Sequence, residues 1–356
     1  MIQSLEYGEN PDIYDKLIMS LFETHELKLA IKYSNVMYEK YPQNPAAVAH
    51  YVKALTQKGE SLKAEKLCVE YLKTNQNAAT LWIHLGFLKE LIYGDDKQAC
   101  ECFKIASELG HKEADYNMAV SYQKQGDYNH AEKIYKSLIQ TRPDDKGIKT
   151  SYGMCLLKQK KFKEGYELFF ERNKSSLDKI TKNKWAPGKD FEKEIVVISD
   201  QGYGDNIQFI RYLPFLKEKT NKVTVAIRKQ LKELFSKNYS YVQFIDYEEI
   251  NPEVQSIRIT DLAYALNMDF DNIPFSASYL KAPSADIKSN KPKIGLCWEA
   301  GGSGIRTMIN RTIHIDLLKP ILDLKNIQLY SFQVDDTFCG NEKYPQMINL
   351  AQNFKN

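Results

Sequence analysis

Two ladders of small or apolar residues run through the first half of the chain. The first ladder, with successive spacings of 34, 34, 33 and 34, consists of Ile18, Val52, Gly86, Ala119 and Gly153. The second, with spacings of 34, 35, 32 and 34, consists of Ala30, Ala64, Ala99, Ala131 and Gly165. This period indicates stacked helical hairpins, because only small side chains let two helix backbones approach closely where they cross. The pattern predicts about five hairpins over residues 10–175.

The best-defined repeat spans residues 112–143 and resembles the tetratricopeptide repeat family. The residues that carry this resemblance are Met118, Ala119, Tyr122, Gly126, Asp127, Tyr128, Ala131, Tyr135, Leu138 and Pro143. The resemblance implies a solenoid over residues 1–175, whose concave face is formed by the first helix of each hairpin and commonly holds a peptide or a partner protein. The polar candidates on that face are His50, Lys53, His84, Glu90, Asn117 and Gln123. They can bind a partner, or they can simply be solvated positions on a helical array.

The second half changes its period to short apolar runs separated by helical stretches, which is typical of a parallel sheet with crossover helices. The predicted strands are 195–199, 223–227, 241–245, 257–259, 294–298 and 328–332. The predicted helices are 206–219, 230–237, 261–266 and 315–324. Residues 281–293, rich in Lys, Ser and Pro, are interpreted as a hinge between two such sheets. We therefore expect one sheet domain over 194–282 and the beginning of a second over 291–356.

A candidate chemical site follows the first of these strands. The strand leads into the turn Gly202-Tyr203-Gly204, and Asp205 stands at the start of the next helix. Such a turn can direct backbone N–H groups and a carboxylate toward one point, where a phosphate or a reacting hydroxyl could lie. The other interpretation is that Asp205 caps the helix that follows.

The same turn opens a longer resemblance. Residues 200–214, Asp-Gln-Gly-Tyr-Gly-Asp-Asn-Ile-Gln-Phe-Ile-Arg-Tyr-Leu-Pro, resemble a motif of bacterial glycosyltransferases that carry tetratricopeptide repeats. Those enzymes are related to the ADP-heptose lipopolysaccharide heptosyltransferases and, more distantly, to O-linked N-acetylglucosamine transferase. The segments 294–298, 310–313 and 331–333 resemble the start of the family's second domain. The resemblance covers about 190–354 and implies a Rossmann-like α/β fold of glycosyltransferase type B.

The resemblance also implies roles for individual residues. Asp205 would be the general base that takes the proton of the acceptor hydroxyl, and Gln208 would lie on the acceptor side. The residues implied to hold the diphosphate of a nucleotide-sugar donor are Gly202, Gly204, Arg311, Thr312 and Gln333. Arg311 can equally be a surface residue in a loop. This scheme requires no metal and no further cofactor.

Two functions from different classes follow. The first is a glycosyltransferase that transfers a sugar from a nucleotide sugar to a protein or glycan acceptor. Residues 291–356 supply 66 residues, where a complete donor lobe needs about twice that number, so we expect a truncated second lobe that is inactive alone. The alternative is a tetratricopeptide scaffold that binds a protein partner and carries a relic glycosyltransferase domain.

Composition narrows the choice of partners. The formal net charge of +3 is too close to balance for a general nucleic-acid binder. Basic residues gather between 172 and 193, and we interpret 176–193 as a solvated basic linker, with an anionic partner as the second possibility. The first residues lack the pattern of a secretory signal, and no apolar run is long enough to span a membrane. Six scattered cysteines fit buried thiols, so we expect a cytoplasmic protein without a zinc site.

Overall fold

A computed structural model of the 356-residue chain describes residues 10–172, 180–274, 278–281, 287–298, 313–333 and 344–350. The described residues divide into two compact units. The first unit contains the described residues within 10–74, 87–94 and 287–350. The second unit contains the described residues within 75–86 and 95–281.

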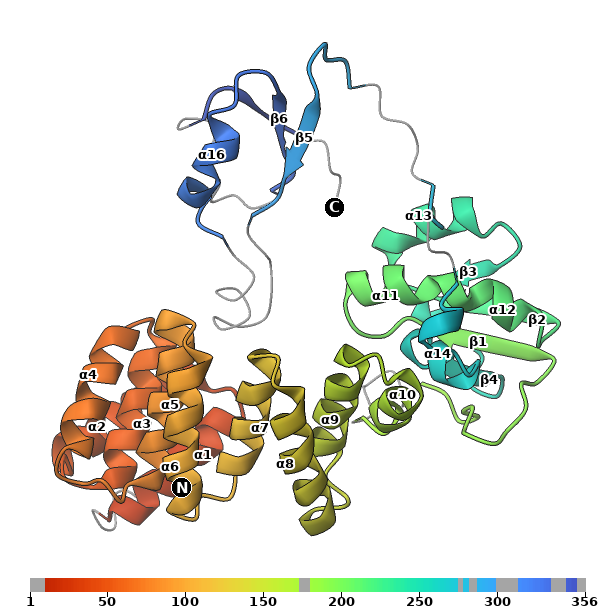
Figure 1. The fold of residues 1–356 in the computed structure, drawn as a ribbon. Coiled ribbons are helices and arrows are strands. Elements are labelled where there is room, and N and C mark those ends of the chain that lie inside the picture. The colour runs from red at the N-terminus through yellow and green to blue at the C-terminus, as the bar shows by residue number, and fades with distance from the viewer. Residues whose placement is uncertain are drawn as a thin grey trace. The chain divides into compact units, whose positions relative to one another are not determined.

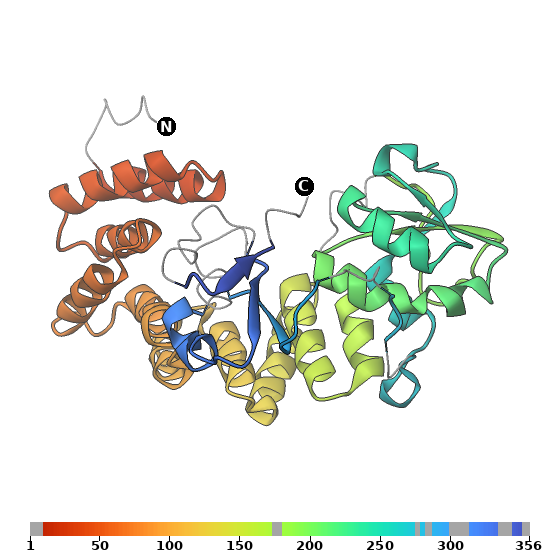
Figure 2. The same ribbon diagram turned by 90° about the horizontal axis from the view of Figure 1, so that it is seen from above.

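The first half of the chain is a tetratricopeptide-like helical solenoid (Figure 1). Its helices are α1 (Pro11–Glu23), α2 (Leu27–Lys40), α3 (Pro45–Gln57), α4 (Ser61–Leu72), α5 (Ala79–Tyr93), α6 (Asp96–Glu108), α7 (Ala114–Lys124), α8 (Tyr128–Thr141), α9 (Lys146–Lys158) and α10 (Phe162–Phe170). Figure 2 shows the same helices from above. The predicted hairpins are confirmed, with odd-numbered helices as the first and even-numbered helices as the second member of each pair.

Local sequence signals explain where these helices begin and end. The Asn44 side chain accepts the backbone N–H groups of Ala46 and Ala47 at the start of α3, where Pro45 occupies the first helical position. The turns within hairpins use Gly59 and Gly126, whose φ angles of 81° and 79° lie in the left-handed region that glycine adopts without steric cost. The hairpin boundaries are therefore encoded locally.

The two ladders meet at the crossings of paired helices. Gly153 on α9 and Gly165 on α10 face each other so closely that a Cβ atom added to Gly153 would lie 2.8 Å from the carbonyl oxygen of Gly165. Between α7 and α8, the ladder residues Ala119 and Ala131 are fully buried beside Tyr135. Small side chains at the crossing bring the backbones together, and aromatic side chains fill the space beside them.

A charged cluster ties α8 to the following hairpin. The Glu132 carboxylate accepts hydrogen bonds from Lys136, Lys161 and Gln159, and its Oε2 lies 2.8 Å from the Lys161 ammonium. Burial raises the pKa of Glu132, but these three donors outweigh burial and lower that pKa to about 2.

The free energy of unfolding should therefore depend on Glu132 in acid. A carboxyl group with a depressed folded pKa contributes stability that is present above pH 4.5 and is lost as the pH falls toward 2. We expect this contribution to be about 1–3 kcal/mol. Urea denaturation at a series of pH values checks it, because Glu132→Gln should flatten the decline between pH 4.5 and 2. An equally steep decline in the variant would contradict the assignment.

A four-stranded parallel sheet follows the repeats. Its strands are β1 (Glu194–Ile198), β2 (Lys222–Ala226), β3 (Gln243–Ile245) and β4 (Gln255–Arg258), in the order β3-β2-β1-β4. The intervening helices are α11 (Tyr203–Phe209), α12 (Leu213–Lys217), α13 (Lys229–Asn238) and α14 (Leu262–Ala265). Both faces of β1 are buried, because Val197 belongs to one apolar cluster and Val196 to another. This double burial explains the uninterrupted apolar runs.

The later residues form a second, smaller parallel sheet. Its order is β5-β6-β7, with β5 at Lys293–Leu296, β6 at Gln328–Ser331 and β7 at Met347–Asn349. The short helix α16 (Lys319–Leu322) lies between β5 and β6 in sequence, within the predicted helical stretch. The strand β7 was not predicted from the sequence. The domain limits at 194–282 and 291–356 stay a prediction.

The basic segment is not solvated throughout, contrary to the interpretation from charge. Thr181 and Trp185 are buried. The backbone N–H of Trp185 donates to the carbonyl oxygen of Ser256, and the N–H of Ser256 donates to the carbonyl oxygen of Asn183. Residues 183–185 thus lie along the edge of β4, where Lys184 forms a parallel bridge with Ser256.

Candidate functional site

The turn after β1 is held together by its own polar groups. Asp205 is exposed, and its Oδ2 accepts the backbone N–H of Gly202 at 3.0 Å. Gln201 has a φ of 61°, which is uncommon for a residue with a side chain. Its carbonyl oxygen accepts a hydrogen bond from Arg228, the residue two positions beyond β2.

From the sequence we expected the backbone N–H groups of the turn and the Asp205 carboxylate to point toward one ligand. The structure shows a different arrangement. The Asp205 carboxylate and the first amide of the turn bond to each other, so the residue serves at least as the helix cap that was the alternative interpretation. Gly204 is exposed, and no heavy atom would lie within 4 Å of a Cβ added there. The backbone at Gly204 therefore has open space in front of it. The roles implied for these three residues stay predictions.

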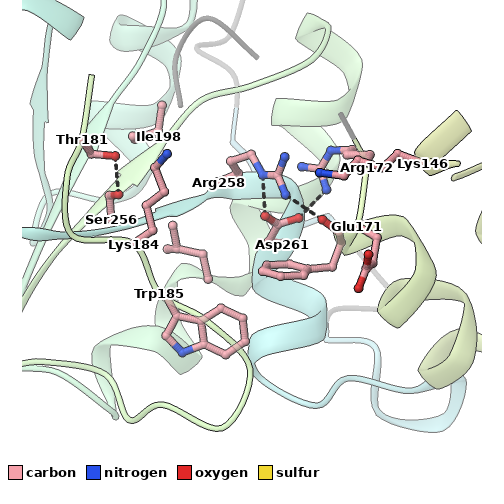
Figure 3. A pocket seen from close by; sticks show the side chains of 12 residues that line it. Lys146, Glu171, Arg172, Thr181, Lys184, Trp185, Ile198, Ser256, Arg258 and Asp261 are labelled. Atoms are coloured by element: carbon pink, nitrogen blue, oxygen red, sulfur yellow. Dashed lines mark hydrogen bonds and ion pairs between the residues drawn. The ribbon is translucent and has the colours of Figure 1, made fainter. Parts of the chain in front are cut away.

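A buried charged network lies beside this turn, and Figure 3 shows three of its members, Arg172, Arg258 and Asp261. The Arg172 guanidinium, just beyond α10, donates to Asp261 at 2.5 Å and to Asp200 at 2.8 Å. It also donates to the Thr260 hydroxyl. Arg258 donates from Nε to the second oxygen of Asp261 at 2.6 Å. The side chains of Arg172, Asp200 and Asp261 are only 6%, 2% and 3% exposed.

The network occupies a particular place in the sheet. The strand order reverses between β1 and β4, and ligands of open parallel sheets commonly bind at the carboxyl ends of the strands where such a reversal occurs. Asp200 follows the end of β1 by two residues, and Thr260 follows the end of β4 by two residues. The guanidinium of Arg172, which bonds to Asp200 and Asp261, therefore lies at this position.

The electrostatics of the network follow from burial and pairing. Burial lowers the pKa of Arg172, but the two carboxylates Asp261 and Asp200 oppose this effect and raise that pKa overall. Burial raises the pKa of Asp261 against the opposing effect of Arg172 and Arg258. A buried guanidinium between two carboxylates is held by charge-assisted hydrogen bonds that neither partner can replace with water.

The remaining predicted residues lie in separate places. Gln208 is exposed on α11. Gln333 is buried in the unit that contains the smaller, three-stranded sheet, where its Oε1 accepts the backbone N–H of Trp298. Gln123 is half-buried on α7, and its Oε1 accepts the hydroxyl of Tyr135. Arg311 and Thr312 lie outside the described residues.

The first helices of the hairpins contact one another within each unit. On α7 and α9, the Tyr116 hydroxyl lies 2.8 Å from the Ser151 Oγ. On the same two helices, Asn117 and Val120 are half-buried, and Met154 is 45% exposed. We call these five residues the α7/α9 face. It mixes apolar groups with hydrogen-bonding groups.

The corresponding helices of the other unit, α1 and α3, are joined by a hydrogen bond between side chains. His50 Nε2 lies 2.7 Å from Asp15 Oδ1. Burial lowers the pKa of His50, although the hydrogen bond and charge of Asp15 oppose the shift. The Lys53 ammonium lies 3.9 Å from the centre of the Phe22 ring, a distance typical of a cation–π contact.

Within the described ranges, no group of three or more His, Cys, Asp and Glu side chains could hold a metal ion. None of the helices in the described part is long and apolar enough to cross a membrane.

Comparison with known proteins gave structural neighbours only. No family model matches the chain, and no curated protein matches it. TTC0263, a thermophilic tetratricopeptide protein of Thermus thermophilus, is 15% identical with a TM-score of 0.43, covering 48% of this chain and 94% of its own. PilF of Pseudomonas aeruginosa is 14% identical with a TM-score of 0.41, covering 48% and 79%. MamA is 17% identical with a TM-score of 0.36, covering 45% and 88%. The glycosyltransferase resemblance gains no support from these matches.

Proposed function

We propose that the chain is a protein-binding scaffold whose first helices receive a segment of a partner protein. The observation that carries this proposal is the α7/α9 face, where the exposed Met154 follows Ser151 by three residues on α9, and the Ser151 hydroxyl is paired with that of Tyr116 on α7. Methionine adapts its shape to different apolar partners, and the neighbouring hydroxyl and amide groups can bond to a peptide backbone. Stacked repeats use such surfaces for extended ligands.

The sheet after the repeats supports a scaffold more than an enzyme. At the position between β1 and β4 where a ligand would commonly bind, Arg172 is already paired with Asp200 and Asp261. The Asp205 carboxylate is engaged with the amide of Gly202. Each of these groups therefore has a partner within the fold.

The proposal is tested by site-specific photo-cross-linking with the full chain. A photoreactive phenylalanine analogue replaces Met154 in one version and Lys133 in the other. Lys133 is an exposed residue of the second helix α8 and serves as the control position. We expect one protein to be cross-linked from position 154 and not from position 133.

Cross-linking alone does not establish the interface, so the captured protein must then be purified and its affinity measured. Met154→Lys should weaken binding at least tenfold, because it places a charge in an apolar contact, whereas Lys133→Ala should leave affinity unchanged. Equal cross-linking from both positions, or an affinity that does not respond to Met154→Lys, would reject the α7/α9 face as the binding surface.

The glycosyltransferase reading is the second candidate, favoured by the exposed Asp205 at the end of the turn after β1. It would use a nucleotide sugar and a protein or glycan acceptor. Its test is thermal-shift titration with ADP and UDP sugars, followed by transfer assays. Under this reading Asp205→Ala abolishes transfer. Under the scaffold proposal no sugar nucleotide binds, and the same variant loses only the roughly 0.5–2 kcal/mol of a helix cap.

A further inference from the structure

The unit that contains the four-stranded sheet also contains a pocket. A pocket of about 260 Å³ opens between the ends of α9 and α10, the segment 181–185 and the strand β4 (Figure 3). Ile198, Ile257 and Phe170 provide apolar walls, and the buried Trp185 closes one side. The pocket has room for roughly eight water-sized groups.

The charges around this pocket do not balance. Four cationic side chains line it, and only two carboxylates, Glu171 and Asp261, do so. Both oxygens of Asp261 already accept guanidinium groups, one from Arg172 and one from Arg258. Glu171 is paired with Lys149, 3.1 Å away. The acidic groups of the lining are therefore already engaged.

The two lysine ammonium groups of the lining differ from these paired groups. In the part of the chain that the structure describes, neither Lys146 nor Lys184 forms an ion pair or a side-chain hydrogen bond. Lys146 is exposed at the start of α9, and Lys184 is half-buried at the edge of β4. A half-buried ammonium in a lining that also contains two guanidinium groups is costly unless an anion joins it.

We propose that this pocket binds a small phosphomonoester. A phosphate dianion offers three oxygens to donors in different directions, which fits two ammonium groups and the Arg258 guanidinium placed around one opening. The organic group of the ester packs against Ile257 and Phe170. A single carboxylate satisfies fewer of these donors. The site is independent of the α7/α9 face, so either proposal can fail without the other.

Isothermal titration calorimetry of the full chain tests the assignment with three probes. Phenyl phosphate should bind with one-to-one stoichiometry, inorganic phosphate should compete with it more weakly, and phenol should not bind. Lys184→Gln should weaken phenyl phosphate binding at least tenfold, since a hydrogen bond to a charged group contributes about 1.5–3 kcal/mol. Lys146→Gln should also weaken it, and this exposed position keeps the test valid should the first variant fail to fold.

The matched control is Lys182→Gln. Lys182 lies two residues before Lys184, but its exposed ammonium is paired with Glu253 at 2.6 Å, outside the pocket. This variant should bind phenyl phosphate as tightly as the unaltered chain. The proposal is overturned if phenyl phosphate does not bind, if neither Lys184→Gln nor Lys146→Gln weakens binding, or if Lys182→Gln weakens it equally.

Discussion

Arg172→Ala should lower the free energy of unfolding by about 3–5 kcal/mol, the largest effect expected of a single side chain here. Removing the guanidinium leaves the buried Asp200 without its cationic partner and leaves Asp261 paired with Arg258 alone among the described residues. An isolated buried carboxylate must either remain ionised in a poor solvent or take up a proton, and both cost free energy. Urea denaturation of the full chain, followed by circular dichroism, measures the loss.

Two further variants test whether the loss of unfolding free energy comes from the buried network or from the removal of any positive charge. Lys149→Ala removes a nearby cation of α9 whose partner Glu171 is half exposed, and it should cost less than about 1 kcal/mol. Combining Arg172→Met with Asp200→Asn and Asp261→Asn removes the charges together and should recover part of the loss. A loss below about 1 kcal/mol for Arg172→Ala would show that the network contributes little.

The repeats could be predicted from the sequence because their signals are local. Each hairpin needs small residues at its crossing and a turn residue between its helices. Both recur at fixed spacing, as with Gly153 and Gly165 or with Gly59 and Gly126. The strands could be predicted for a similar reason, since a strand buried on both faces is an uninterrupted apolar run. The exception is β7 at Met347–Asn349, where the apolar run is only two residues long and stands between Gln346 and Asn349.

The buried network was missed because it depends on contacts between distant residues. Arg172 lies 28 positions from Asp200 and 89 from Asp261 in sequence, and counting charge placed it in a solvated basic run. One signal was available. Asp200 and Asp261 each follow an apolar strand of one parallel sheet, and the carboxyl ends of such strands meet at one edge. Two carboxylates brought together there require a cation.

The Asp205 turn illustrates the opposite case, in which a correct local prediction left the function open. The strand lies where it was predicted, whereas the helix predicted over 206–219 begins earlier, at Tyr203, and is divided into α11 and α12. A carboxylate three residues after the start of such a turn can cap the helix or act on a ligand, and the sequence is the same in both cases. The hydrogen bond to Gly202 shows the cap directly, whereas the catalytic role requires a donor and an acceptor to test.

Gly153→Ala should destabilise the chain by about 1–3 kcal/mol, although alanine is the better helix former by about 1 kcal/mol. The added Cβ would lie 2.8 Å from the carbonyl oxygen of Gly165 and 2.9 Å from the backbone nitrogen of Phe169. Both are backbone atoms of α10, so neither can rotate away, and the two helices would have to separate. The free energy of unfolding in urea measures the change.

Gly204→Ala is the matched control, because the same substitution should act there with the opposite sign. Gly204 is exposed within α11, and an added Cβ would meet no heavy atom within 4 Å. Without a clash, alanine should stabilise the chain by about 0.4–1 kcal/mol through the lower entropy of the unfolded state. If Gly153→Ala also stabilised the chain, close contact at the α9/α10 crossing would not be the reason for glycine in the ladder. The opposite signs would show that the 34-residue repeat of small residues reflects backbone contact.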